Sequence, residues 1–166
     1  MKQLTVISGK GGTGKTSITA AFASLARGNA VFADCDVDAA DLHLILKPRV
    51  KKTMVFHGLK IASIDKKQCI GCKKCYEHCR FNAIDEEINL VEERCEGCGV
   101  CVYVCPVNAV SMVDRNSGFV YVSETRFGPM VHASLNTAEE ASGKLVTMVR
   151  ENAKAVAEER NKDLVI

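Results

Sequence analysis

The sequence predicts an α/β protein in which a parallel sheet is interrupted by a small α+β module rich in cysteine. Two observations carry this prediction. The chain opens with an apolar segment, a glycine-rich loop and a helical pattern, followed by a second apolar segment. Further along, eight of the nine cysteines fall into two stretches that align without a gap. The remaining segments have the patterns of additional strands and one long helix.

The composition is that of a globular protein. The chain has 166 residues, of which 47% are hydrophobic and 25% charged, and this fits one domain with room for a small insert. A net charge of +2 gives no electrostatic footprint for nucleic acid, and no apolar run approaches the ~20 residues that span a bilayer. We therefore expect a cytoplasmic protein with no nucleic-acid partner and no membrane insertion. Cysteines at regular spacing in that reducing compartment favour metal over disulfides.

The first elements form a parallel unit. Residues 3–8 (QLTVIS) predict a buried strand, residues 16–26 (TSITAAFASLA) a packed helix, and residues 30–34 (AVFAD) a second strand. Two strands joined through one helix are expected to lie parallel in the same sheet. An acidic stretch, DCDVDAAD, follows and runs into the apolar residues 42–46 (LHLIL).

A change of charge marks the insert. Residues 47–67 hold seven Lys or Arg and one Asp, whereas residues 69–110 hold four basic and seven acidic residues. We place the first part of the α/β domain at 1–60, the insert at 61–115 and the return to the first domain at 116–166. In the last part, SMVD and FVYVS flank the turn-like RNSG (115–118) as an expected hairpin, and residues 125–135 are expected to be extended. A helix is predicted from Ser142, its expected N-cap, and the final DLVI is expected to be a strand.

The two aligned stretches are CIGCKKCYEHCRFNAI (69–84) and CEGCGVCVYVCPVNAV (95–110). Each has the spacing C-x2-C-x2-C-x3-C, and the second ends in Cys105-Pro106, the run that binds 4Fe-4S clusters in bacterial two-cluster proteins. The short spacers let three thiolates surround one face of a cubane, and backbone amides of the loops can donate to its sulfurs. The sequence therefore predicts two 4Fe-4S clusters.

In proteins with this run, the fourth cysteine of each repeat ligates the other cluster. This rule gives Cys69, Cys72, Cys75 and Cys105 for the first cluster, and Cys95, Cys98, Cys101 and Cys79 for the second. The alternative is a pair of structural zinc sites, which the three successive short spacers fit less well. Cys35 lies outside both repeats and is expected to be a small buried thiol.

Residues 9–16 (GKGGTGKT) match G-x4-G-K-[ST] between a predicted strand and a predicted helix, which identifies a phosphate-binding loop. Its amides and the helix N-terminus favour phosphate, Lys15 is expected to reach the β and γ groups, and Thr16 to ligate Mg²⁺. The expected cofactor is ATP with magnesium, held by the loop residues Gly9, Lys10, Gly11, Gly12, Thr13, Gly14, Lys15, Thr16 and Ser17.

KGGTGKTS, with its early Lys10, resembles the deviant Walker A loop of the MinD/ParA-type ATPases, a group that includes the nitrogenase iron protein. The resemblance implies that Lys10 reaches the nucleotide of a partner subunit, so that the chain would form a homodimer or pair with a homologous ATPase. It also implies that Asp36, in the stretch Asp34 to Asp38, orients the attacking water or contacts magnesium. Lys10, Lys15 and Asp36 are thus the expected catalytic residues, whereas Asp34, Asp38 and Asp41 have simpler roles as solvated or helix-capping acids.

A P-loop domain interrupted by a ferredoxin-like insert resembles the branch of the MinD superfamily that carries two 4Fe-4S clusters. In that branch, the strand similar to DLVI continues into a second switch loop and further strands, so the resemblance implies an incomplete nucleotide-binding sheet with ATP hydrolysis near background. The implied function is an ATP-gated dimer that passes electrons to a redox partner whose identity the sequence does not reveal. The alternatives are an ATP-dependent carrier or assembly factor for clusters, and a redox-sensing switch.

Overall fold

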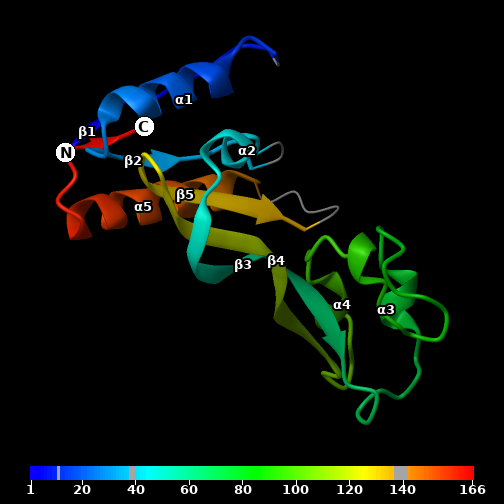
Figure 1. The fold of residues 1–166 in the computed structure, drawn as a ribbon. Coiled ribbons are helices and arrows are strands. Elements are labelled where there is room, and N and C mark those ends of the chain that lie inside the picture. The colour runs from blue at the N-terminus through cyan, green and yellow to red at the C-terminus, as the bar shows by residue number, and fades with distance from the viewer. Residues whose placement is uncertain (11, 38–39, 137–141) are drawn as a thin grey trace. The chain divides into compact units, whose positions relative to one another are not determined.

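The computed structural model describes residues 1–10, 12–37, 40–136 and 142–166, and divides into two compact units (Figure 1). Unit 1 comprises residues 1–56 and 118–166, and unit 2 comprises residues 57–117. The strands are β1 (Lys2–Gln3), β2 (Ala30–Ala33), β3 (Arg49–Ile64), β4 (Val110–Thr125), β5 (Gly128–Leu135) and β6 (Leu164–Val165). The helices are α1 (Lys15–Ala26), α2 (Leu42–Leu46), α3 (Lys74–Glu77), the 3₁₀ helix η1 (Glu92–Arg94), α4 (Val100–Tyr103) and α5 (Ser142–Glu159).

The strands form one mixed sheet in the order β1-β6-β2-β5-β4-β3. β6 lies between β1 and β2 and is parallel to both, and β2 is also parallel to β5. β4 is antiparallel to β5, from the pair Gly118 and Leu135 to the pair Thr125 and Gly128. The predicted α/β class and the strand at DLVI are confirmed, but the sheet is parallel only on the side that holds β1, β6, β2 and β5.

The helices of unit 1 cover the two faces of this sheet. Val31 and Val131 pack in one core cluster with Leu145 and Val149 of α5. Phe32 follows Val31 and Met130 precedes Val131, so both side chains point to the opposite face of the sheet. They pack with α1 and α2 in a second cluster. Alternation along β2 and β5 thus places α5 on one face and the two earlier helices on the other, as Figure 1 shows.

The first predicted strand is largely absent. β1 ends at Gln3, and the one further backbone bond toward a neighbouring strand is from the Leu4 amide to the Val165 carbonyl at 2.9 Å. Residues 4–8 are exposed apart from the half-buried Val6. The physical reason is pairing: β6 runs beside β1 for two residues, and beyond the Leu4 bond residues 5–8 have no hydrogen-bonded strand neighbour among the described residues.

The predicted hairpin at RNSG is wrong. Residues 115–118 lie inside β4, which continues from Val110 to Thr125. The turn lies ten residues later, at Arg126 and Phe127, where the Thr125 hydroxyl donates to the Gly128 carbonyl at 2.8 Å and accepts from the Phe127 amide at 3.0 Å. Gly128 has a φ of +128°, and a Cβ there would meet the Ala30 carbonyl at 2.9 Å. Strand pairing overrides the turn preference of Asn, Ser and Gly, while Thr125 and Gly128 define the real turn.

The basic stretch after residue 47 also contains an element that the sequence analysis missed. β3 covers residues 49–64, begins in unit 1 and ends in unit 2. It is an edge strand of the sheet, and residues 49–53 are all exposed. Exposed lysines are a common protection of such edges against unwanted pairing, which explains why this strand lacks an apolar pattern.

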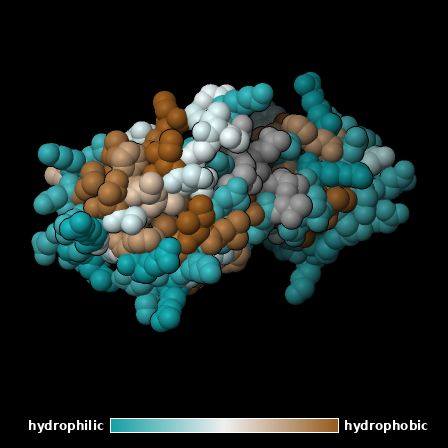
Figure 2. Space-filling model, turned by 45° about the horizontal axis from the view of Figure 1, so that its top comes forward, coloured by the Kyte–Doolittle hydropathy of each residue, from teal (hydrophilic) through white to brown (hydrophobic). Residues whose placement is uncertain are grey.

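The helix predicted from Ser142 is confirmed as α5, although the Ser142 side chain lies outside the described residues. Figure 2 shows apolar side chains at the surface of unit 1 on the side that carries α1, where Ile18 is 50% and Leu25 73% exposed. Within the described part of the chain, no helix has the length and apolar character needed to cross a membrane.

Candidate iron–sulfur and nucleotide sites

Unit 2 is built from two short helices, each embedded in one cysteine repeat. α3 carries Cys75 and α4 carries Cys101, the third cysteine of each repeat. The glycine shared by the repeats has a positive φ in both, +70° at Gly71 and +65° at Gly97. At Gly97 a Cβ would also collide with the Lys60 carbonyl, so this position requires glycine for two separate reasons.

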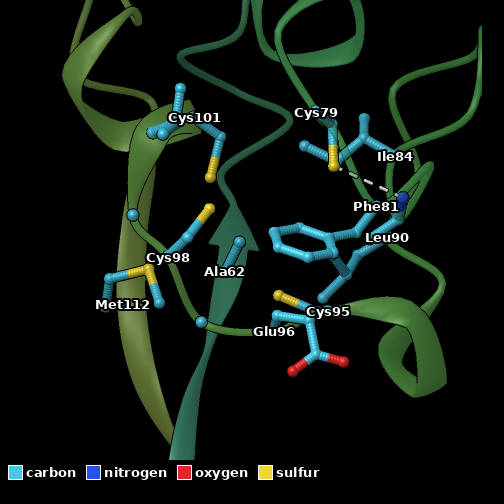
Figure 3. Close-up of a pocket in the computed structure, with 14 residues that line it drawn as sticks. Ala62, Cys79, Phe81, Ile84, Leu90, Cys95, Glu96, Cys98, Cys101 and Met112 are labelled. Carbon is cyan, nitrogen blue, oxygen red and sulfur yellow. Dashed lines mark hydrogen bonds between the residues drawn. The ribbon is translucent and has the colours of Figure 1, made fainter.

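The structure gathers the cysteines into two sets. One cavity is lined by three cysteines of the first repeat and the fourth of the second, namely Cys69, Cys72, Cys75 and Cys105. The other is lined by three cysteines of the second repeat and the fourth of the first, namely Cys95, Cys98, Cys101 and Cys79. Figure 3 shows this second set around one pocket, with Phe81, Ile84 and Leu90 beside the sulfurs. Most of the other side chains in both linings are apolar, which limits the access of water to a group held by the thiols.

The fourth cysteine of each repeat accepts a backbone hydrogen bond. The Ala83 amide donates to Cys79 Sγ at 3.4 Å, and the Ala109 amide donates to Cys105 Sγ at 3.2 Å. The residue before each of these alanines is an asparagine, Asn82 or Asn108, and both have a φ near +50°. Asparagine tolerates this left-handed conformation better than most residues. The conformation orients the amide of the following alanine toward the sulfur of the fourth cysteine. Such bonds stabilise a thiolate and tune a bound cluster.

The thiols differ in acidity. Burial raises the pKa of Cys75 and of Cys101, the equivalent residues of the two repeats. At Cys105 desolvation also acts to raise the pKa, but the backbone amides around the sulfur outweigh it, and the pKa is lowered. Metal binding requires the thiolate, so a metal must displace the proton from Cys75 and from Cys101.

The cavities fit a cluster better than a single ion. Within the described ranges, no three His, Cys, Asp or Glu side chains are gathered in a way that could hold one metal ion. A zinc ion needs four ligands converging at about 2.3 Å, whereas a cubane takes one thiolate at each of four separate iron corners. Four cysteines spread around a shared space suit the second arrangement. His78 lines neither cavity, and its Nδ1 lies 2.9 Å from the Lys74 carbonyl.

Comparison with known families decides the chemistry of unit 2. Residues 62–112 match the 4Fe-4S dicluster domain. The dicluster domain covers both repeats and the cavities described above, and it assigns iron–sulfur rather than zinc chemistry to them. Over 155 residues the chain is also 37% identical to an uncharacterized protein of Methanocaldococcus jannaschii. The match covers 92% of this chain and 55% of that protein, so the chain spans about half the length of the curated relative that it matches.

Unit 1 carries the glycine-rich loop. Gly12 and Gly14 have φ values of +78° and +92°, and α1 begins directly after Gly14 at Lys15. The Thr13 hydroxyl donates to the Lys10 carbonyl at 3.1 Å, and the Lys10 side chain is exposed. Gly11 of the expected nucleotide site and Asp38 of the acidic stretch lie outside the described residues. The loop thus leads into the N-terminus of a twelve-residue helix, the position where phosphates bind favourably.

Two of the expected catalytic residues meet. Lys15 Nζ donates to Asp36 Oδ2 at 2.5 Å, and this hydrogen bond, acting against desolvation, raises the pKa of Lys15. Asp34 is buried, and burial raises the pKa of its carboxyl although the Asp36 and Leu42 amides both donate to it at 3.2 Å. Asp34 therefore has a helix-capping role at the start of α2, which is one of the two alternatives expected for it, and is not solvated.

A groove of about 550 Å³ opens beside this pair, within the range of roughly 300–1,000 Å³ typical of ligand pockets. Thr16 lines it together with Lys15, Asp34 and Asp36, whereas Ser17 is exposed on α1 and is not among its lining residues. Cys35 lines the groove and packs against the core. It is half-buried, and so less buried than the sequence predicted. Thr19 also lines the groove, and its hydroxyl donates to the Lys15 carbonyl at 2.9 Å. The loop motif ends before Thr19 and therefore did not predict its place at the site.

Proposed function

We propose that this chain belongs to an ATP-responsive electron-transfer protein that holds two 4Fe-4S clusters. Cys69, Cys72, Cys75 and Cys105 would ligate the first, and Cys95, Cys98, Cys101 and Cys79 the second. The observation that carries the proposal is the composition of the two cavities, each of which combines three cysteines of one repeat with the fourth of the other. Bound clusters would supply one-electron transfer without bond making or proton uptake.

The residues of unit 2 would retain the clusters rather than release them. All eight ligands come from one chain, and Cys75 is buried. The Ala83 and Ala109 amides would stabilise the thiolates of the crossed ligands, and the apolar linings would limit hydrolysis of the clusters by water. These features favour electron transfer over cluster delivery, the rival function.

Unit 1 would bind ATP with magnesium at the groove next to the loop. Lys15 would exchange its bond with Asp36 for the β- and γ-phosphates, Thr16 would ligate magnesium, and Asp36 would then face the metal or the attacking water. We further propose that Lys10, whose side chain is exposed on the loop, reaches the nucleotide of a second subunit. ATP would thereby control the association of two subunits and the access of a redox partner to the clusters.

The experiment is anaerobic reduction of the reconstituted protein by a limiting low-potential donor, followed by absorbance, with and without Mg·ATP. We expect about eight iron and eight sulfide per chain, since each cubane holds four of each, and a change in reduction rate with ATP that Lys15→Ala abolishes. Equal rates in the presence of bound ATP would refute the coupling. Transfer of iron and sulfide to an apo-ferredoxin, faster with ATP, would instead support the carrier function.

A further inference from the structure

The two cluster cavities are related by the sequence repeat, yet they differ in charge at two lining positions. Lys73 lines the first cavity, and the aligned residue at the second is Gly99. Ile70 lines the first cavity, and the aligned residue at the second is Glu96. Both exchanges act in the same direction, because each makes the surroundings of the first cavity more positive than those of the second.

Lys73 occupies a conformation that disfavours it. Its φ is +59°, close to the +74° of Gly99 at the equivalent position of the other repeat. Nothing lies within 4 Å of a Cβ built at Gly99, so space does not explain why one repeat has glycine and the other lysine. A side chain kept in the left-handed region where its counterpart is glycine indicates that the side chain itself has a use.

Cations outside the two linings lie near both cavities. Lys66 Nζ donates to the carbonyls of Glu87 at 3.0 Å and of Ile88 at 2.7 Å, and Ile88 lines the first cavity. Arg94 Nη1 donates to the Asn82 carbonyl at 3.5 Å, next to Phe81 and Ala83 of the second cavity. Arg115 Nη1 also donates to the Glu92 carbonyl at 2.8 Å, two residues after Leu90 of the second cavity. Cations held on backbone carbonyls therefore lie near both cavities, and the charge difference between the linings rests on the two exchanged positions.

We propose that Lys73 and Glu96 set the reduction potentials of the two clusters apart, with the first-repeat cluster higher than the second. A reduced cluster carries one more negative charge than an oxidised one, so a nearby ammonium favours reduction and a nearby carboxylate opposes it. The intramolecular step is then the loss of one electron by the second cluster and its gain by the first, with no proton or ligand transferred. The second cavity is the entry side for electrons, and the first cavity, with Ile70 64% exposed at its lining, is the exit side.

This inference rests on the proposed function, and its test separates the two. The cluster potentials of the anaerobic protein are measured by EPR at a series of solution potentials, in the native sequence and in two single-cluster backgrounds. Cys79→Ala with Cys98→Ala leaves the first-repeat cluster, and Cys72→Ala with Cys105→Ala leaves the second. Absence of clusters in the native protein would overturn both proposals, whereas clusters of equal potential, or a higher second cluster, would overturn this one alone.

The variants exchange residues between the repeats. Lys73→Gly should lower the potential of the first-repeat cluster alone, Glu96→Ile should raise that of the second alone, and Lys73→Arg should retain the native value. Both shifts should shrink at high ionic strength, because exposed charges are screened by salt. Lys74→Gln is the matched control, since Lys74 is an exposed neighbour outside the lining of either cavity. A Lys73→Gly potential equal to the native value, with eight iron bound, would contradict the assignment.

Discussion

Lys15 and Asp36 form an ion pair across the expected phosphate site, with Lys15 Nζ 2.5 Å from Asp36 Oδ2. Both side chains are about one-third exposed, at 35% and 36%, so the pair is reachable from the groove. At the proposed nucleotide site, a triphosphate would compete with this carboxylate for the same ammonium group. The pair would then link the affinity for nucleotide to the presence of magnesium, which would give Asp36 a different partner.

From this relationship we expect Asp36→Asn to bind ATP more tightly than the native chain when magnesium is absent, because the competing charge is gone. With magnesium, the variant should lose the gain in affinity that the metal gives the native protein. Lys15→Ala should weaken binding about tenfold or more under both conditions, since a hydrogen bond to a charged group contributes about 1.5–3 kcal/mol. Calorimetric titration with and without magnesium checks this, and an Asp36→Asn variant that responds to magnesium like the native chain would exclude Asp36 from the metal site.

Lys10 should behave differently from Lys15. Lys10→Ala is expected to leave ATP binding at low protein concentration nearly unchanged, and to reduce ATP-dependent association at high concentration. Analytical ultracentrifugation with a non-hydrolysable ATP analogue measures the association, and Lys2→Ala, at an exposed lysine of β1, serves as the control. If Lys10→Ala impairs binding by the isolated chain as strongly as Lys15→Ala does, the role across a subunit interface is wrong.

Gly97→Ala and Gly71→Ala form a matched pair. Both place a side chain at positive φ, which costs roughly 1–2 kcal/mol, but only Gly97→Ala also drives a Cβ into the Lys60 carbonyl. We expect Gly97→Ala to lose the second-repeat cluster or to lower the melting temperature clearly more than Gly71→Ala. Thermal unfolding and iron content of the anaerobic proteins provide the comparison, and equal losses would mean that the close approach to Lys60 is unimportant.

His132 predicts a pH dependence of stability. Its ring stacks on Tyr121 with centroids 5.0 Å apart, and its Nε2 lies 3.0 Å from the Ser123 hydroxyl. Burial, with a smaller effect of His43, lowers the pKa of His132 from 6.5 to about 4. Between these values the unfolded chain binds a proton that the folded chain does not, so stability falls as the pH drops from about 6.5 toward 4.

The loss should be on the order of 1–2 kcal/mol after allowance for the partial solvent exposure of the ring. Denaturant unfolding of the anaerobic protein at pH 7 and pH 5.5 measures it. His132→Phe should flatten the dependence, and the exposed His78→Phe should not. An unchanged slope in His132→Phe would assign the effect to other groups.

Local patterns predicted which cysteines gather at each cavity, whereas features that depend on distant pairing were predicted poorly. Cysteine spacing is decided within a few bonds, so Cys69 and its partners could be assigned from the sequence. The turn residues at 115–118 were misleading because the pairing of β4 with β5 outweighs the preference of a four-residue segment. The strand at residues 4–8 depends on a neighbour that β6 provides only beside Lys2 and Gln3. The difference between Lys73 and Gly99 was visible in the aligned repeats, but its meaning required the backbone angle and the cavity lining.

The central claim is that two 4Fe-4S clusters are held by crossed sets of cysteines, and an iron count by native mass spectrometry of two double variants tests it most directly. Cys79→Ala with Cys98→Ala removes two ligands from the same crossed set, so we expect about four iron atoms to remain in the other cluster. Cys79→Ala with Cys72→Ala removes one ligand from each set, so we expect both clusters to be lost or degraded. If about four iron atoms remain in Cys79→Ala with Cys72→Ala, and none in Cys79→Ala with Cys98→Ala, each repeat ligates its own cluster. That result would contradict the crossed assignment.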